Sequence, residues 1–193
     1  MVPDHDDSDS DAQLIRSVDD AAAFTPLVER HSSALHGYFA RRVPASADDL
    51  LAETWLQAFA TRRTFDTSRG SARAWLFGVA RNVLAGYLRR AGREVTSPAP
   101  AASDPWQAVD QRLDAAALAP ALHRALADLP IGERELILLV TWEHLTPTEA
   151  AAVVGIPAGT ARSRLHRARS RLRERLAQPR PARRHMTVTG DLA

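Results

Sequence analysis

The sequence predicts an all-α protein built from two small helical domains. Apolar residues recur at three- and four-residue spacing in several separate stretches, which is the period of an amphipathic helix. Glycine or proline follows several of these stretches, as expected where helices end. A segment rich in Pro, Ala and Ser over residues 93–115 breaks the pattern. We therefore expect helical domains over residues 20–92 and 116–178, joined by a linker.

The chain begins with an acidic segment. Residues 1–19 are rich in Asp and Ser and poor in apolar side chains, so they are expected to form a disordered tail. From Ala21 the apolar spacing becomes helical and continues to about Arg42, because Pro44 follows closely. The first domain is thus expected to start with a helix that packs one apolar face inward.

A second helix is expected from about Ser46, a residue type that often caps helices. Its expected inward residues are Leu51, Ala52, Trp55, Leu56 and Phe59. The residues left pointing outward are Asp49, Leu50, Glu53 and Gln57. Such a mixed acidic and apolar strip is either ordinary solvated surface or a docking face for another protein, and the strip alone leaves both readings open.

A polar, basic loop over residues 61–70 leads into a helix expected over residues 71–90. The loop holds Arg62, Arg63 and a single aromatic side chain, Phe65. Phe65 considered alone is best explained as a plug into the core. Without further information the loop is therefore a connector.

The helix over residues 71–90 presents a face suited to contact. Its outward residues are expected to be Ala74, Gly78, Arg81, Asn82, Ala85 and Arg89, with Trp75 at the edge. The small residues would let a partner approach the backbone closely, whereas Arg81 and Arg89 suit phosphates and Asn82 suits a base edge. The alternative is an exposed amphipathic helix without a partner.

The second domain contains a helix-turn-helix pattern. Leucines at helical spacing predict a helix over residues 116–129, which Pro130 ends. The spacing of a capping box marks a later helix start, at Thr146, Pro147 and Glu149. A tight break follows, formed by Gly155, Pro157 and Gly159. The last helix is expected from about Ala158.

This last helix is strongly basic. Its apolar stripe, expected to face the core, consists of Ala161, Leu165, Ala168, Leu172 and Leu176. The groups available to a partner near its start include Thr160, Arg162, Ser163, Arg164, His166 and Arg167. Between Thr160 and Arg184 there are ten arginines and one glutamate, a charge pattern typical of phosphate-binding surfaces. A solvated basic helix is the alternative, but the capped helix and turn directly before it favour DNA binding in the major groove.

Composition excludes several classes of function. The chain has 193 residues, a formal net charge of +2 and no Cys, so disulfides and thiolate metal sites are excluded. The seven His lack metal-ligand spacing, and neither a Gly-Lys-Ser/Thr phosphate loop nor a catalytic arrangement is recognisable, so no metal, cofactor or catalysis is expected. No apolar run approaches the roughly 20 residues of a membrane span, and we expect a cytoplasmic protein without membrane insertion. Residues 179–193 are expected to form a basic tail.

Two separate blocks resemble one protein family. Residues 47–90 read ADDLLAETWLQAFATRRTFDTSRGSARAWLFGVARNVLAGYLRR, and residues 129–176 read LPIGERELILLVTWEHLTPTEAAAVVGIPAGTARSRLHRARSRLRERL. These blocks resemble regions 2 and 4 of the sigma-70 family of bacterial transcription initiation factors, in the family's order and spacing. The short linker resembles that of the extracytoplasmic-function subfamily.

The resemblance implies roles for three sets of residues. The loop over residues 62–71 would accept a flipped base of the minus-10 promoter element, and the following helix would bind that strand as it melts. The implied minus-10 set is Arg62, Arg63, Phe65, Trp75, Arg81, Asn82 and Arg89. The implied minus-35 set is Thr160, Arg162, Ser163, Arg164, His166 and Arg167. The implied polymerase-binding set is Asp49, Leu50, Glu53 and Gln57.

The resemblance also implies partners and a function. The partners are core RNA polymerase, at its clamp and flap regions, promoter DNA and an anti-sigma factor of the kind that holds many relatives inactive. The implied function is that of an alternative sigma factor, which directs polymerase to specific promoters and promotes strand opening. An autonomous helix-turn-helix regulator, which binds duplex DNA without polymerase, would explain residues 136–176 but leaves the block at 48–90 without a purpose.

Overall fold

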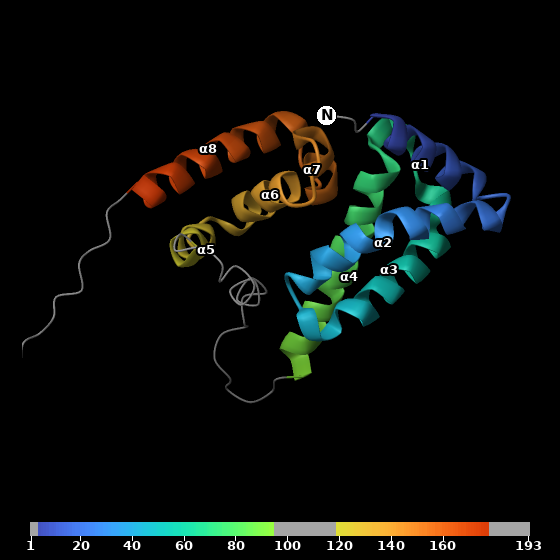
Figure 1. Cartoon of the computed structure of the whole chain (residues 1–193), viewed down its shortest axis with the longest axis horizontal. Helices are drawn as coiled ribbons and strands as arrows, with labels where there is room; N and C mark the ends of the chain where they lie inside the picture. The colour runs from blue at the N-terminus through green and yellow to red at the C-terminus, as the bar shows by residue number, and fades with distance from the viewer. Residues whose placement is uncertain (1–3, 95–118, 178–193) are drawn as a thin grey trace, which may run out of the picture.

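The computed structural model describes residues 4–94 and 119–177, which fold into two helical bundles (Figure 1). The first bundle consists of α1 (Asp4–Arg16), α2 (Thr25–Ala40), α3 (Ala47–Thr61) and α4 (Ala72–Glu94). The second consists of α5 (Ala119–Ala127), α6 (Ile131–Thr141), α7 (Pro147–Val154) and α8 (Ala158–Ala177). Only α-helices and short 3-10 helices occur in the described ranges, so the all-α prediction is confirmed. Most of the predicted linker and the whole predicted basic tail lie outside those ranges.

The acidic N-terminal segment is helical from Asp4, so the expectation of a disordered tail over residues 1–19 is wrong for α1. Leu14 is completely buried, and burying a leucine side chain contributes roughly 1.5–3 kcal/mol. Arg30 donates to Asp9 at 2.7 Å, and the backbone N–H of Ala72 donates to Asp11 at 2.5 Å. These partners lie 21 and 61 residues away along the chain, where a count of local composition cannot register them. α1 therefore belongs to the first bundle.

α2 packs on α3 and α4 with the face that the sequence predicts. Its buried residues include Leu27, His31, Leu35, Tyr38 and Phe39. Burial raises the pKa of Tyr38 to about 12, the usual effect of removing an ionisable phenol from water. These buried side chains form part of the core of the first bundle.

α3 is rotated from its expected register. Its buried stripe contains Leu50, Thr54 and Ala58, while Leu56 is 69% exposed. The prediction that Leu50 points outward and Leu56 inward is therefore wrong. The hydroxyl of Thr54 donates to the carbonyl of Leu50 at 2.7 Å, so a threonine can occupy the core face with its polar group satisfied. A prediction that assigns only apolar residues to the core face of the helix misses this arrangement.

α4, a long helix of the first bundle, also contacts α7 of the second bundle. Its core face buries Leu76, Ala80 and Val83, as the spacing predicts. Ala74, expected to point outward, is buried because α7 packs against this helix. The predicted cap at Ser46 is also corrected: its hydroxyl lies 3.0 Å from that of Tyr87, and α3 has no side-chain cap.

The second bundle contains the predicted helix-turn-helix. Thr146 and Glu149 form the capping box of α7, and Gly155 ends it in the left-handed conformation with φ of 75°. α8 packs on α5, α6 and α7 through Ala161, Leu165 and Ala168. Leu176, expected in the same stripe, is 44% exposed because the C-terminal end of α8 extends beyond the core.

Candidate nucleic-acid interface

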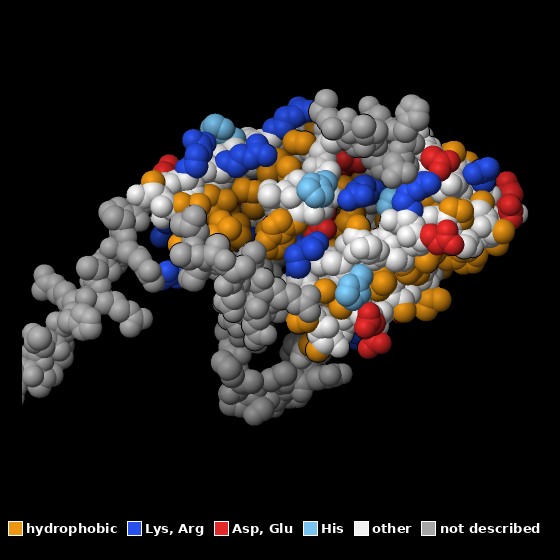
Figure 2. Space-filling view, in the orientation of Figure 1, with side chains coloured by type: hydrophobic (Ala, Val, Ile, Leu, Met, Phe, Trp, Pro, Cys, Tyr) orange, Lys and Arg blue, Asp and Glu red, His pale blue; other side chains and the backbone are white. Residues whose placement is uncertain are grey.

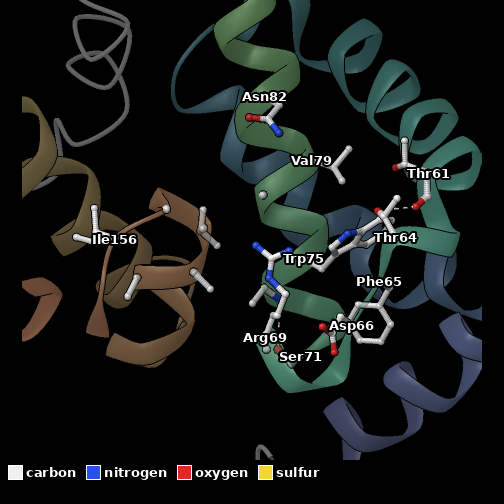
Figure 3. A pocket seen from close by; sticks show the side chains of 17 residues that line it. Thr61, Thr64, Phe65, Asp66, Arg69, Ser71, Trp75, Val79, Asn82 and Ile156 are labelled. Carbon is white, nitrogen blue, oxygen red and sulfur yellow. Dashed lines mark hydrogen bonds between the residues drawn. The ribbon is translucent and has the colours of Figure 1, made fainter. Parts of the chain in front are cut away.

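A groove of about 760 Å³ opens between the first bundle and α7 (Figure 3). The N-terminal half of α4 forms one wall with Trp75, Val79 and Asn82. Ile156, which follows α7, lies across the groove. The loop between α3 and α4 closes one end with Phe65. The groove thus combines aromatic and amide groups in a space accessible from solvent.

The loop beside this groove has a defined conformation. It contains two short 3-10 helices, Arg62–Thr64 and Thr67–Arg69. Asp66 accepts a hydrogen bond from the backbone N–H of Ser68 at 2.9 Å, and hydrogen bonds from the side chain and backbone of Ser68 lower the pKa of Asp66. Gly70 has φ of 146°, a conformation that side chains disfavour. These features hold Phe65 edge-on to Trp75, with 6.0 Å between the ring centroids.

The structure brings part of the predicted minus-10 set together. Phe65, Trp75 and Asn82 line the groove. Arg63 is exposed on the adjoining loop, whereas Arg89 is exposed farther along α4 and outside the groove lining. The aromatic pair and the amide therefore form the centre of this candidate site.

Arg62, another member of that set, is turned away from the groove. Its guanidinium donates to the carbonyls of Ser17 at 2.9 Å and Phe59 at 2.5 Å. It also stacks over the Phe59 ring, 3.8 Å from the centroid. In this structure Arg62 fastens the α1–α2 connection to α3.

The remaining member, Arg81, contacts the second bundle. Its Nε lies 2.7 Å from a carboxylate oxygen of Glu135 on α6. Burial lowers the pKa of Arg81, but the hydrogen bond and charge of Glu135 outweigh it, so the net shift is upward. Near the same junction, Ser71 donates to Glu149 of α7. The face of α4 expected to meet DNA is thus in contact with α6 and α7.

A second ion cluster lies where α2 approaches the α6–α7 connection. Arg41 donates to both carboxylate oxygens of Glu143 at 2.6 Å, and Arg73 donates to the backbone carbonyl of Glu143 at 2.7 Å. Arg42 lies 3.6 Å from the same carboxylate and stacks over Tyr38 at 3.7 Å. Sequence reasoning did not single out Arg41 or Arg73, whose only signal is a basic residue next to a helix end.

α8 presents the predicted minus-35 residues at the surface. Arg162, Ser163, His166 and Arg167 are exposed, while Thr160 and Arg164 are half-buried. The buried alanines and leucine on the opposite side of α8 fix this orientation. Glu133, on α6, receives a hydrogen bond from Arg171 at 2.6 Å and lies 3.9 Å from Arg167. The N-terminal turns of α8 therefore project polar and basic groups away from the bundle.

Comparison with known proteins identifies both bundles. Residues 27–94 match Sigma-70 region 2, and residues 120–172 match Sigma-70 region 4. The chain is 35% identical over 177 residues to the ECF RNA polymerase sigma factor SigF of Caulobacter vibrioides, with 86% of this chain and 92% of the relative covered. It is 31% identical to the ECF RNA polymerase sigma factor RpoE of Cereibacter sphaeroides, with the same shares covered. The chain belongs to the ECF RNA polymerase sigma factors.

Two solved structures have the same fold. The sigma factor RpoE from Bartonella quintana, in a complex with the anti-sigma factor NepR, matches with a TM-score of 0.58 at 28% identity, covering 79% of this chain and 96% of that one. CnrH, in a complex with the cytosolic domain of CnrY, matches with a TM-score of 0.59 at 24% identity, covering 86% and 96%. The resemblance drawn from the sequence is thereby confirmed, and this ECF sigma factor is a transcription initiation factor.

The polymerase-binding set predicted for this sigma factor lies on α3. Asp49 and Gln57 are exposed and Glu53 is half-buried, with Gln57 donating to Glu53 at 2.7 Å. Leu50 is 4% exposed, so its side chain lies in the core rather than on this strip. The exposed apolar group near the strip is Leu56, which the sequence placed inward.

Membrane-spanning helices and metal-binding clusters are both absent from the described ranges. None of the helices there is long and apolar enough to cross a membrane. No group of His, Asp and Glu residues in those ranges is arranged to hold a metal ion.

Proposed function

We propose that this ECF sigma factor binds core RNA polymerase, directs it to specific promoters and promotes strand opening at the minus-10 element. The observation that carries the proposal is the presence in one chain of two separate surfaces suited to DNA. The region 2 side of the groove carries aromatic and amide groups, and region 4 has an exposed, basic helix, α8. A duplex-binding regulator would need only the second.

For the minus-10 element, we assign the unpaired strand to the groove beside α4. Phe65 and Trp75 offer ring faces and edges on which an unstacked base can rest, and Asn82 offers both a donor and an acceptor to a base edge. Arg63 supplies positive charge next to the groove. A protein that binds unpaired bases better than paired ones favours melting, because binding then offsets the cost of unstacking.

For the minus-35 element, we assign the first turns of α8 to the major groove. Ser163, His166 and Arg167 are exposed and placed to reach base edges, while Arg162 and Arg169 flank them and suit phosphates. Arg167 Nε lies 3.9 Å from a carboxylate oxygen of Glu133, and the Arg167 side chain stays 57% exposed, so its guanidinium is accessible to a base edge.

For polymerase, we assign the clamp to the outer strip of α3, with Asp49, Glu53 and Gln57 as contacts. Region 4 would meet the flap. The relative from Bartonella quintana was solved with an anti-sigma factor, which supports a regulatory partner of that kind here. RNA synthesis belongs to the polymerase, so we assign no catalytic step to this chain, and we place its action in the cytoplasm.

Run-off transcription tests the proposal. Purified chain and core RNA polymerase, incubated with a library of promoter fragments from the source genome, should yield discrete transcripts that core polymerase alone does not make. Gel-shift measurements on the same fragments distinguish the rival regulator. A regulator would bind a specific duplex tightly without polymerase and give no transcript, and that pair of results would overturn the assignment.

A further inference from the structure

The second bundle carries opposite charges on two sides. The arginines of α8 gather on its outer side (Figure 2), whereas Glu135, Glu143 and Glu149 face the first bundle. Each of these three carboxylates meets a hydrogen-bond donor of the first bundle. Binding a promoter through α8 does not require acid on the opposite side, and while Glu149 also forms the capping box of α7, Glu135 and Glu143 need a separate explanation.

Glu143 has the most enclosed of these carboxylates. Its side chain is 1% exposed, and Arg41 donates to both of its oxygens at 2.6 Å. Arg42 lies 3.6 Å away, and Arg73 donates to the backbone carbonyl of the same residue. Removing a carboxylate from water is costly unless its oxygens are well paired, and both oxygens of Glu143 accept from the same nitrogen of Arg41. The same donor geometry fits two oxygens of a phosphate.

The contact between the two bundles has the features of an interface that can open. Beside these ion pairs and the packing of α7 on α4, it leaves a groove of about 760 Å³ that is open to solvent. Ala74, Ala151 and Ala152 line that groove with small side chains. Polar contacts with incomplete packing are typical of domains that move relative to one another.

The arginines of the first bundle that contact the second bundle lie beside the proposed strand-binding groove. Arg73 and Arg81 are eight residues apart on α4, or about 12 Å along the helix axis. Arg41 adds a third guanidinium at the C-terminal end of α2.

We infer that Arg41, Arg73 and Arg81 form a phosphate-binding surface for the unpaired DNA strand, and that Glu135 and Glu143 occupy this surface until the two bundles separate. The inference rests on the proposed function, since it extends the strand from the groove across α4. Carboxylates of region 4 thus stand in for phosphates. Strand binding by region 2 and closure of region 4 onto region 2 then exclude each other.

The test measures single-stranded DNA binding by the full chain without polymerase. Fluorescence anisotropy of a labelled oligonucleotide of mixed sequence gives Kd at several salt concentrations. Glu135→Gln and Glu143→Gln should each tighten binding roughly fivefold or more, because a larger fraction of the chain is open. Glu29→Gln, on the exposed side of α2, is the matched control and should leave Kd unchanged.

The arginine variants separate a phosphate contact from a simple latch. Arg41→Gln and Arg73→Gln also remove the closing contacts, so a latch alone predicts that they bind the strand as well as the wild type or better. Our inference predicts the opposite sign: binding weakens, and the slope of log K against log salt becomes shallower by about 0.7 for each phosphate that the variant no longer neutralises. Arg16→Gln, exposed on α1, serves as the control.

Separation of the bundles is followed in the same variants. The chain has no native Cys, so Ala60→Cys and Glu174→Cys on exposed positions accept a dye pair for energy transfer. Transfer should fall in the glutamine variants and when oligonucleotide is added to the wild type. Equal or tighter binding by the arginine variants would overturn the inference, as would unchanged Kd in both glutamate variants. These readouts need no polymerase, so failure of the proposed function in run-off transcription is a separate result.

Discussion

Phe65 and Trp75 meet edge to face at one end of the groove, and Asn82 lies farther along the same helix as Trp75. Aromatic faces bind any unstacked base, whereas an amide that reaches a base edge distinguishes one base from another. In the proposed function, the three side chains together provide both affinity for a single strand and a means of selecting its sequence.

Asn82→Ala should reduce open-complex formation more than closed-complex binding. Removing one base-edge hydrogen-bonding group costs about 1–3 kcal/mol, and this interaction is available only when the strand is unpaired. Permanganate footprinting measures opening and gel shift measures closed-complex binding on the same promoter. Ser33→Ala, an exposed change on α2, is the control. Equal reductions in both assays would assign Asn82 to duplex binding.

Arg167→Ala should lose roughly 1–3 kcal/mol of discrimination at one base pair of the minus-35 element. Its guanidinium is exposed near the start of α8, where it can reach a base edge. Transcription from a set of single-base promoter variants gives the discrimination. Arg173→Ala, exposed farther along α8, should weaken all promoters alike. The same uniform weakening in Arg167→Ala would show a phosphate contact only.

At this scale the sequence predicts residue types better than their partners. The placement of Phe65, Trp75 and Asn82 follows from loop and helix periodicity together with the family resemblance. Arg62 could not be placed in that way, because the Ser17 carbonyl that it contacts lies 45 residues away in the chain. Arg41 and Arg73 were missed for the same reason, since Glu143 is 102 and 70 residues distant.

The start of α7 is the helix start that the sequence predicts most completely. Thr146 accepts from the backbone N–H of Glu149, and the Glu149 carboxylate accepts from the backbone N–H of Thr146. Both bonds involve residues three apart, so the spacing alone reveals them.

Thr146→Ala should destabilise region 4 by about 1 kcal/mol, because a helix-start N–H loses its acceptor. Urea unfolding followed by circular dichroism measures the free energy of unfolding. Thr148→Ala, in the same helix turn and outside the capping box, is the matched control. If the two variants lose the same free energy, the capping box does not stabilise α7.

Charge reversal on α3 tests the proposed polymerase strip. Glu53→Arg should weaken binding to core polymerase because it replaces an acidic contact on the outer strip with a basic one. Co-purification with core enzyme measures the interaction, and circular dichroism checks that the helices are intact. Glu29→Arg on α2 makes the same change elsewhere. Unchanged co-purification of Glu53→Arg would remove this strip from the interface.

Helices with a regular apolar stripe were predictable, and those fixed by polar or distant contacts were not. α2 and α8 follow the period of their apolar residues. α3 does not, because Thr54 fills a core position while its hydroxyl bonds within the helix. α1 was predicted as disordered from its local composition. Its acidic side chains bind Arg30 and the N-terminus of α4, and no local pattern shows these distant contacts.

Across the whole molecule, α6 and α7 rest on the face of α4 that is proposed to bind the melted strand. Arg81 meets Glu135, and Arg41 meets Glu143, in this arrangement. Under the proposed function, this arrangement covers part of the strand-binding face of region 2 while α8 remains exposed. Our further inference is that engagement of both promoter elements requires the two bundles to separate, which polymerase binding at two distant points would favour.

The most direct test of the account is permanganate footprinting of a promoter identified by run-off transcription. The proposed function predicts reactive thymines at the minus-10 element only when the chain and core polymerase are both present. Neither component alone should produce them. Reactive thymines with core polymerase alone, or no reactivity with both components on a promoter that yields transcripts, would contradict the assignment of strand opening to this chain.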